Sequence, residues 1–259
     1  MSRSEPQISQ IAGGRVLGRG RAVSDYVVRL ASGPADIKAA QTLRFIVFNL
    51  ELNEGLEHSY LTFRDADKFD EVCDHLVVEH TKSGEIIGTY RLQTGTAAAG
   101  ALGYYSAQEF DMSSFDPVRS QTVELGRACV HSCHRNPAVL GMLWRGIANY
   151  ARVHGARYLV GCSSISSNDP TIGASAYFKL RERHLAPESF RANPLPHFLC
   201  PIDTCSEIPV KIPKLLTAYL SLGAWVCGPP AIDREFKTID FLTLLDLEML
   251  SPRVAERLL

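Results

Sequence analysis

The chain has 259 residues, of which 46% are hydrophobic and 21% charged, a composition typical of a soluble globular protein with a sizeable core. Its formal net charge is −1 and its Lys and Arg residues are scattered, which argues against a nucleic-acid-binding protein. No apolar run approaches the roughly 18 residues that span a bilayer, and the N-terminus lacks the apolar core of a secretory signal.

The first part of the chain predicts a strand, a helix and a hairpin. Residues 1–24 are polar and contain several glycines and arginines, so we expect a flexible tail. The sequence YVVRLA, residues 26–31, predicts a short strand. Residues 32–52 predict a helix, because Pro34 suits a first helical turn and apolar residues then recur at helical spacing. Residues 74–94 hold two apolar runs around the turn KSGE, which indicates a β-hairpin.

The middle of the chain alternates strands and helices. We expect a Gly/Ala-rich loop over residues 95–103 and then a buried strand over residues 122–130. Residues 136–155 are amphipathic and end at Gly155, a residue type that commonly terminates helices. This helix leads directly into a strongly apolar strand over residues 157–165.

The last third continues the pattern. A helix is predicted over residues 169–184 with Asp169 as its cap, and residues 185–210 are Pro-rich and irregular. Residues 211–223 then predict a helix, and two strands and a short C-terminal segment complete the chain: AWVCG at 224–228, TIDFLTLLDLEML at 238–250 and SPRVAERLL at 251–259.

This order of elements predicts an α/β fold with a mixed central β-sheet flanked by helices. The hairpin argues against a purely parallel sheet. No internal repeat occurs and no linker divides the chain, so we expect residues 25–259 to form a single domain.

The cysteines indicate the compartment. They number seven, an odd count, and lie mostly within apolar stretches, which is typical of reduced thiols in a cytoplasmic protein. The segment CVHSCHR, residues 129–135, interleaves its cysteines and histidines too tightly for one tetrahedral site, so we expect no metal. The segment GCSSISS, residues 161–167, lacks the nucleophile elbow of a serine hydrolase.

Charged and aromatic residues beside this apolar framework form four candidate clusters. Their members are Arg44 with Phe48 on one helical face, Asp67 with Asp70, Arg91 at the end of the hairpin, and Glu124 with Arg127. Each cluster also has a structural interpretation: an arginine that snorkels, a solvated helix start, an outward-facing strand residue, and a structural ion pair.

Glu124 and Arg127 lie in TVELGRACV, a stretch that otherwise predicts a buried strand. Positions three apart point to opposite faces of a regular strand, so these side chains converge only where the strand bulges. Gly126 between them is a natural bulge residue. We therefore expect a bulge at Gly126 and a functional site beside it.

Together the four clusters resemble the signature of acyl-homoserine lactone synthases: R-x3-F, D-x2-D, GTYRL and E-x2-R, in that order. The wider sequence is more similar to bacterial ornithine lipid-forming N-acyltransferases and N-acyl amino acid synthases. That resemblance covers roughly residues 26–250 and includes CDHLVVEHTKSGEIIGTYRL, VELGRACV and PKLLTAYLSLGAWVCGPPAIDREFKTIDFLTLLDL. It implies a fold related to the GCN5-type N-acetyltransferases (GNAT).

The resemblance implies transfer of a (3-hydroxy)fatty acyl group from acyl carrier protein to the α-amine of an amino acid, ornithine in the best-known case, for aminolipid biosynthesis. By motif match it carries over Arg44, Phe48, Asp67, Asp70, Arg91, Glu124 and Arg127.

The chemistry of these residue types agrees with this activity. A carboxylate in an apolar setting can accept the proton of the attacking amine, which makes Glu124 the first choice for the base. Asp67 and Asp70 could hold a cationic acceptor, and an arginine its carboxylate. Backbone N–H groups of the bulge could bind the thioester oxygen.

Two departures from related families narrow the prediction. The segment HRNPAVLGML lacks the R/Q-x-x-G-x-G/A pattern that binds the pyrophosphate of coenzyme A, which favours acyl carrier protein as donor and leaves acyl-CoA as the alternative. The segment NLELNEGLEHSYLTF lacks the tryptophan usual in lactone synthases, so lactone synthesis is the second candidate. A non-catalytic lipid- or carrier-binding module is the third.

We expect no bound cofactor and a cytoplasmic location. The amphiphilic product and the apolar segment AYLSLGAWVCG, residues 218–228, raise the hypothesis of peripheral contact with the inner face of the membrane.

Overall fold

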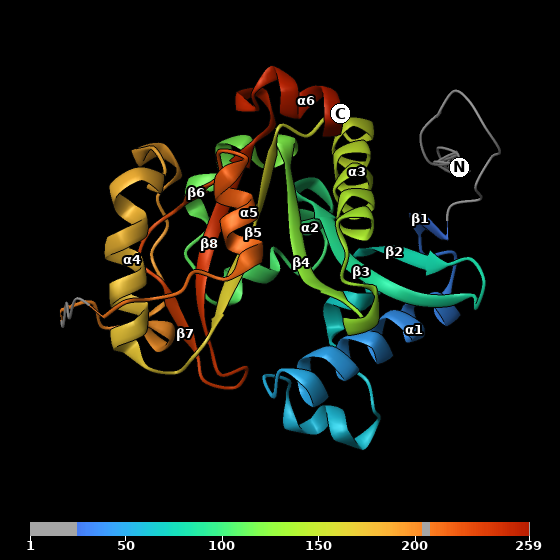
Figure 1. The fold of residues 1–259 in the computed structure, drawn as a ribbon. Helices are drawn as coiled ribbons and strands as arrows, with labels where there is room; N and C mark the ends of the chain where they lie inside the picture. Colours follow the sequence, from blue (N-terminus) through green and yellow to red (C-terminus); the bar gives the residue numbers. More distant parts are fainter. Residues whose placement is uncertain (1–24, 204–207, 259) are drawn as a thin grey trace.

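The computed structural model describes residues 25–203 and 208–258. One mixed sheet runs through this part of the chain in the order β1-β2-β3-β4-β5-β8-β6, and β7 pairs with β8 beside that path (Figure 1). The strands are β1 Tyr26–Leu30, β2 Asp74–His80, β3 Glu85–Thr94, β4 Thr122–Val130, β5 Tyr158–Ser166, β6 Trp225–Val226, β7 Ala231–Asp233 and β8 Thr238–Asp246. The predicted tail, residues 1–24, lies outside the described residues.

Six α-helices surround the sheet in the described residues. They are α1 Pro34–Phe45, α2 Gly95–Gly100, α3 Pro137–Val153, α4 Pro170–His184, α5 Lys214–Ser221 and α6 Pro252–Leu258. A single π-helical stretch, Ile46–Glu51, extends α1. None of these described helices is long and apolar enough to traverse a bilayer.

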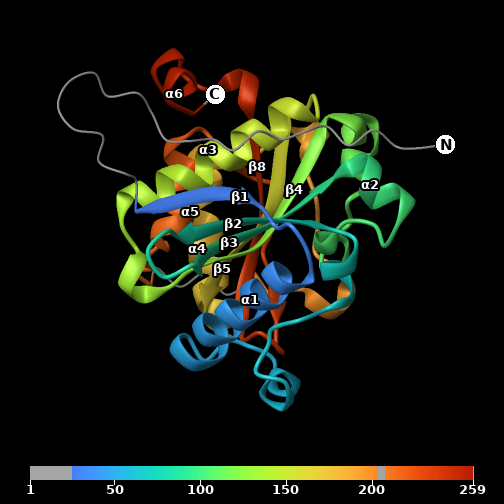
Figure 2. The same ribbon diagram turned by 90° about the vertical axis from the view of Figure 1, so that its right-hand side faces the viewer.

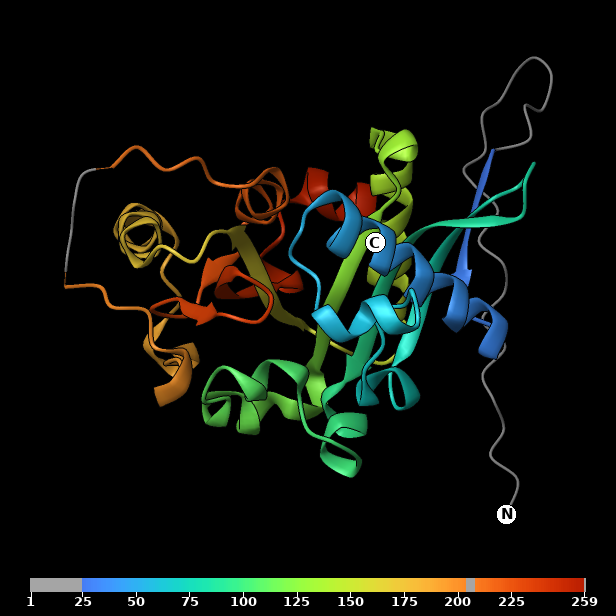
Figure 3. The same cartoon turned by 90° about the horizontal axis from the view of Figure 1, so that it is seen from below.

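Helices cover both faces of the sheet. Figure 2 shows α3 on one side of β1, β2 and β3 and α1 on the other, in agreement with their packing. Leu143 and Ile147 of α3 join the main hydrophobic core with Tyr219 of α5. Figure 3 shows α5 and the segment 95–121 on opposite sides of the sheet. The mixed α/β sheet predicted from the sequence is confirmed.

The sheet opens between β4 and β5. These neighbours are parallel, whereas all other paired strands are antiparallel, and they pair only from Thr122 with Tyr158 to Glu124 with Val160. The next residue of β5 is Gly161, where a Cβ would lie 2.1 Å from the carbonyl oxygen of Leu125. Glycine therefore permits the last close approach before the two strands diverge.

The predicted bulge is present, but on a different residue. Gly126 pairs with Arg91 of β3 and Cys129 with Thr89, so β4 holds one extra residue opposite Tyr90. Arg127 takes the left-handed conformation, with φ 48°, whereas Gly126 does not. The bulge therefore places the strain on the charged residue.

Most predicted elements are confirmed, and two expectations are corrected. Helix α4 begins after Asp169, whose carboxylate accepts the N–H of Thr171, and Gly155 beyond α3 has φ 63°. The predicted loop at 95–103 instead contains helix α2, which Thr94 caps through the N–H of Ala97. Strand β7 was not expected, because its three residues carry no periodic signal.

Candidate active site

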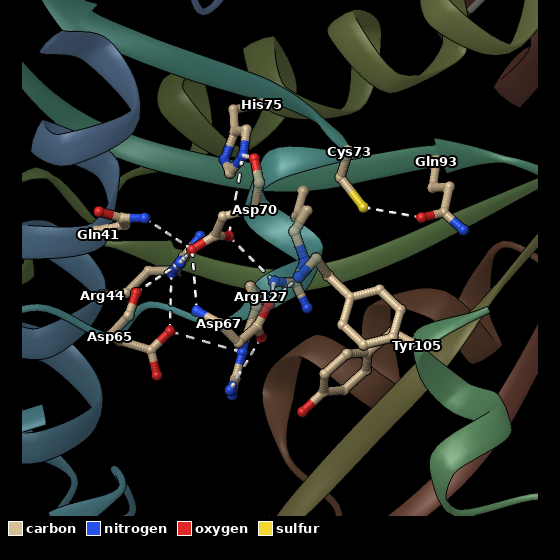
Figure 4. A network of polar contacts seen from close by, with 12 residues as sticks. Gln41, Arg44, Asp65, Asp67, Asp70, Cys73, His75, Gln93, Tyr105 and Arg127 are labelled. Atoms are coloured by element: carbon tan, nitrogen blue, oxygen red, sulfur yellow. Dashed lines mark hydrogen bonds and ion pairs between the residues drawn. The ribbon is translucent and has the colours of Figure 1, made fainter. Parts of the chain in front are cut away.

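Five charged residues form a network beside α1 and β3, and Figure 4 labels four of them: Arg44, Asp65, Asp67 and Asp70. Arg44 is fully buried; its Nε donates to Oδ1 of Asp65 at 2.9 Å and its Nη2 to Oδ2 of Asp70 at 2.6 Å. Arg91 donates through Nη1 to Oδ1 of Asp67 at 2.7 Å and to Oδ1 of Asp70 at 3.1 Å. We call these five residues the aspartate–arginine network.

The network sets two guanidinium groups against three carboxylates, and Asp70 contacts both guanidinium groups. Burial alone would raise the pKa of Asp70, but the guanidinium groups of Arg44 and Arg91 outweigh it and hold that pKa well below its ordinary value. Asp70 also accepts a hydrogen bond from Nε2 of Gln41 at 2.9 Å. Asp70 is therefore a fully engaged, ionised carboxylate.

Arg127 borders this network without joining it firmly. Its Nε lies 3.6 Å from Oδ1 of Asp65 and its Nη2 3.8 Å from Oδ2 of Asp67, distances too long for hydrogen bonds. The buried Nε has no hydrogen-bond partner in the described part of the chain. The guanidinium lies over the ring of Phe236, 4.1 Å from its centroid, and over that of Tyr105 at 5.4 Å. Arg127 thus keeps donor capacity for a ligand.

Glu124 is only 4% exposed and anchors a neighbouring turn. Its Oε2 accepts the N–H of Tyr105 at 2.7 Å and its Oε1 that of Ser106 at 2.8 Å. Burial raises its pKa, although these N–H bonds oppose the shift. Among the ion pairs of the described residues none joins Glu124 to Arg127, so the structural pair considered from the sequence is not formed.

A cavity of about 330 Å³ lies in the opening between β4 and β5. Its wall changes character along β5 and its partner β8. Near the start of β5 the lining is apolar and includes Leu159 and Leu245; towards its end the lining is polar and includes Ser164, which lies opposite Asp240. The bulge residue Arg127 lines the same cavity.

Several known proteins are similar to this chain in sequence or in fold. Residues 43–145 match the family model for an acetyltransferase (GNAT) domain. An L-ornithine N(alpha)-acyltransferase of Brucella abortus (strain 2308) is 34% identical over 253 residues, covering 92% of this chain and 89% of that protein. Another L-ornithine N(alpha)-acyltransferase, from Rhodobacter capsulatus, is 32% identical over 246 residues, which cover 89% of this chain and 93% of that protein.

The chain belongs to the L-ornithine N(alpha)-acyltransferase family. It is therefore an acyltransferase, and the predicted enzyme class is confirmed. The crystal structure of FeeM, an N-acyl amino acid synthase from uncultured soil microbes, has the same fold, with a TM-score of 0.51 and 13% identity over 86% of this chain and 91% of that one. The predicted GNAT-like fold is confirmed as well.

Some of the predicted site residues of this acyltransferase line a cavity or depression, and the others do not. Phe48 and Arg127 line the cavity, and Asp67 lines a depression beside it. Within the described chain, the remaining ones lie behind the cavity wall: Arg44, Asp70, Arg91 and Glu124. The structure therefore brings all of them into one region, and their individual roles stay predictions.

Three carboxylates in the cavity of this acyltransferase were missed from the sequence: Glu109, Asp233 and Asp240. Burial raises the pKa of Glu109 well above its ordinary value and that of Asp240 to about 6. Asp240 is a carboxylate between Ile239 and Phe241 in an apolar strand. That is the same signal that identified Glu124.

Proposed function

We propose that this enzyme transfers a fatty acyl group from the thioester of an acyl carrier protein to the α-amine of ornithine, forming the lyso-lipid of aminolipid synthesis. The observation that carries this proposal is a single cavity that joins an apolar wall at Leu159 and Leu245 to a polar wall at Arg127 and Asp240. An acyl chain fits the first and a charged amino acid the second. Relatives named for ornithine acylation support the choice of acceptor.

In the proposed reaction the neutral α-amine attacks the thioester carbonyl carbon. A C–N bond forms, the C–S bond breaks and the thiol of phosphopantetheine leaves with one proton. The ammonium proton of the acceptor passes to Glu124. Because Glu124 does not line the cavity, we assign this transfer to an intervening water.

Arg127 is the proposed binder of the acceptor carboxylate. Its Nε lacks a hydrogen-bond partner among the described residues, and its guanidinium lines the cavity. A guanidinium binds a carboxylate through two parallel hydrogen bonds. Gly126, Arg127 and Ala128 also line the cavity and no longer pair with β5, which supports the proposed role of their N–H groups in binding the thioester oxygen.

We propose a positioning role for the aspartate–arginine network. The sequence assigned Asp67 and Asp70 to a cationic acceptor and offered Arg44 or Arg91 for its carboxylate. These four side chains are instead bonded to one another and to Asp65. Four network atoms have no hydrogen-bond partner in the described chain: Nη1 of Arg44, Nη2 of Arg91, Oδ2 of Asp65 and Oδ2 of Asp67. The ion pairs of the network can still hold α1, β3 and the bulge in place while Arg127 contacts substrate.

The start of α3 supports acyl carrier protein as the donor. Oδ1 of Asn136 accepts the N–H groups of Ala138 and Val139, both at 3.0 Å. These N–H groups would otherwise be available to a pyrophosphate at the N-terminus of the helix. We therefore expect a higher kcat/KM with acyl carrier protein than with acyl-CoA of the same chain; equal values would contradict this choice of donor.

We also propose that this enzyme is cytoplasmic and contacts the membrane peripherally, through a different surface from the one expected from the sequence. The segment that first motivated it, residues 218–228, is largely buried, as Tyr219 and Val226 show. Leu61 and Phe63 are 84% and 65% exposed and offer an apolar contact instead. Liposome co-sedimentation should fall when both are changed to serine; unchanged co-sedimentation would exclude this surface.

The catalytic proposal is tested by Glu124→Gln, with the exposed Glu85→Gln as control. Ornithine and an acyl-carrier-protein thioester are incubated with each enzyme, and N-acyl ornithine is measured by mass spectrometry. A general base contributes roughly 10²–10⁴-fold, so the first variant should lose that much and the control nothing. An unchanged rate for Glu124→Gln would remove Glu124 from the mechanism. No product from wild type with ornithine, but product with a homoserine-type acceptor, would favour lactone synthesis.

A further inference from the structure

The three carboxylates missed from the sequence come together from three separate elements. Glu109 directly follows the 3-10 turn Tyr105–Gln108, Asp233 is the last residue of β7, and Asp240 lies on β8. One carboxylate oxygen from each lies within 4.8 Å of the other two. We call these residues the carboxylate triad.

The triad has unsatisfied oxygen atoms. Glu109 and Asp240 are 5% and 4% exposed, yet Oε2 of Glu109 and Oδ1 of Asp240 have no hydrogen-bond partner in the described part of the chain. The other oxygen of Asp240, Oδ2, accepts the hydroxyl of Thr238 at 2.9 Å. Asp233 uses Oδ1 to accept the N–H groups of Glu235 and Phe236. No described lysine or arginine forms an ion pair with any of the three.

Such an arrangement is unfavourable unless a proton or another cation completes it. A buried carboxylate without a partner loses solvation that nothing repays, and two neighbouring carboxylates repel each other. Burial accordingly raises the pKa of Asp240 to about 6, and that of Glu109 rises well above its ordinary value. The cavity is thus prepared for positive charge at this end.

We propose that Glu109, Asp233 and Asp240 bind the side-chain ammonium of the acceptor amino acid and so select a cationic acceptor over a neutral one. This inference rests on the proposed function, because it names the residues of that site that recognise the side chain of the acceptor amino acid. Three acceptor oxygens match the three N–H donors of an ammonium group. Tetrahedral donors at about 2.8 Å would separate those oxygens by about 4.6 Å, which falls within the 4.8 Å limit that the three oxygens satisfy.

The position of the triad relative to Arg127 supports an amino acid as the ligand. Both line the same cavity, and the charge of Arg127 acts on Glu109 strongly enough to oppose the rise in its pKa. A diamino acid carries a carboxylate at one end and a second ammonium at the other. Arg127 and the triad would therefore hold its two ends and leave the α-amine between them.

Glu124 contributes to this subsite indirectly. It binds the N–H groups of Tyr105 and Ser106, which begin the turn that leads to Glu109. The backbone carbonyl of Glu109 also accepts the N–H of Leu195 at 2.7 Å. Glu109 is therefore held from both sides rather than placed on a free loop.

The test compares ornithine with norleucine, in which a methyl group replaces the side-chain ammonium. Binding of each to the free enzyme is measured by calorimetry, and acylation of each by thiol release. The variants are Asp240→Asn and Glu109→Gln. Asp111→Asn is the matched control, because it removes one exposed carboxylate two residues from Glu109.

Wild type should prefer ornithine by roughly 100-fold, because norleucine leaves the triad unpaired. Each triad variant should reduce that preference by at least about tenfold, through weaker ornithine binding with little change for norleucine. The control should keep the wild-type ratio. Circular dichroism melts establish that each variant is folded.

Three results would overturn the inference. The first is that folded triad variants keep the wild-type preference for ornithine over norleucine. If the enzyme still acylates ornithine, that result leaves the proposed function intact. The second is calorimetric binding of neither amino acid by wild type; if product formation fails as well, the proposed function fails with it. The third is tight binding of Ca²⁺ or Mn²⁺ that Asp240→Asn abolishes while ornithine selectivity stays unaltered.

Discussion

Two groups of buried or half-buried carboxylates in this acyltransferase differ in their partners. Asp65, Asp67 and Asp70 face Arg44 and Arg91 at hydrogen-bonding distance, and the pKa of Asp70 lies well below its ordinary value. The carboxylate triad at the end of the cavity has no such partners among the described residues, and the pKa values of two members are raised. The fold places two arginines against the first group and, within the described chain, no close cation against the second.

This difference separates positioning from recognition. A carboxylate whose partner is built into the protein stabilises one arrangement and cannot bind a substrate without breaking it. A buried carboxylate without a partner destabilises the free protein and gains when a cation arrives. Arg127 lies between the two groups, near the first and open to the second.

The largest effect should follow from breaking the first group. Arg44→Met removes a guanidinium that two buried aspartates share, and loss of one partner from a buried pair costs about 3–5 kcal/mol. Urea unfolding should show this loss at pH 7. Arg145→Met, on the exposed face of α3, is the control and should change stability by less than about 0.5 kcal/mol. Equal stabilities for the two variants would mean that the network is not structural.

Much of the fold was predictable because its signals are local. Alternating apolar residues marked β4, the turn KSGE marked the hairpin β2–β3, and Gly155 marked the end of α3. The bulge followed from two charges three positions apart in one strand. Its position on Arg127 did not, because left-handed backbone at a non-glycine residue is imposed by tertiary contacts.

The site was predictable only in part. Its positions came from an ordered set of motifs, but which residues reach the cavity depends on pairing between distant side chains. Arg44 and Arg91 look like equal candidates for substrate binding until their aspartate partners are placed. Glu109 and Asp240 are far apart in sequence and meet only because β8 inserts beside β5.

An intermediate effect should follow at the boundary between the groups. Arg127→Lys keeps the charge but loses the forked guanidinium, so kcat/KM for the amino acid acceptor should fall by roughly 10–100-fold. Because Arg127 makes no close ion pair, the free energy of unfolding of the Arg127→Lys variant should differ from wild type by less than about 1 kcal/mol. Steady-state kinetics and urea unfolding measure the two quantities. A large loss of stability with unchanged kinetics would instead assign Arg127 to the aspartate–arginine network.

The smallest effect should be a change in stability that has opposite signs in the two groups. The raised pKa of Asp240, about 6, means that the folded protein holds a proton that the unfolded chain releases, so stability falls as pH rises from about 4 through 6. Asp240→Asn removes this penalty and should stabilise the free enzyme at pH 8 but not at pH 4.

Asp70→Asn should do the reverse. The lowered pKa of Asp70 contributes stability that is present above its unfolded pKa and is lost only in acid, so this variant should be less stable at pH 8, with a difference that shrinks towards low pH. Thermal melts at several pH values test both variants. Saturating ornithine should then stabilise wild type more than Asp240→Asn, because binding energy adds only where the cation finds its carboxylates. Two variants that both lose stability at pH 8 would show that the triad is satisfied by the protein itself, and the contrast between the groups would disappear.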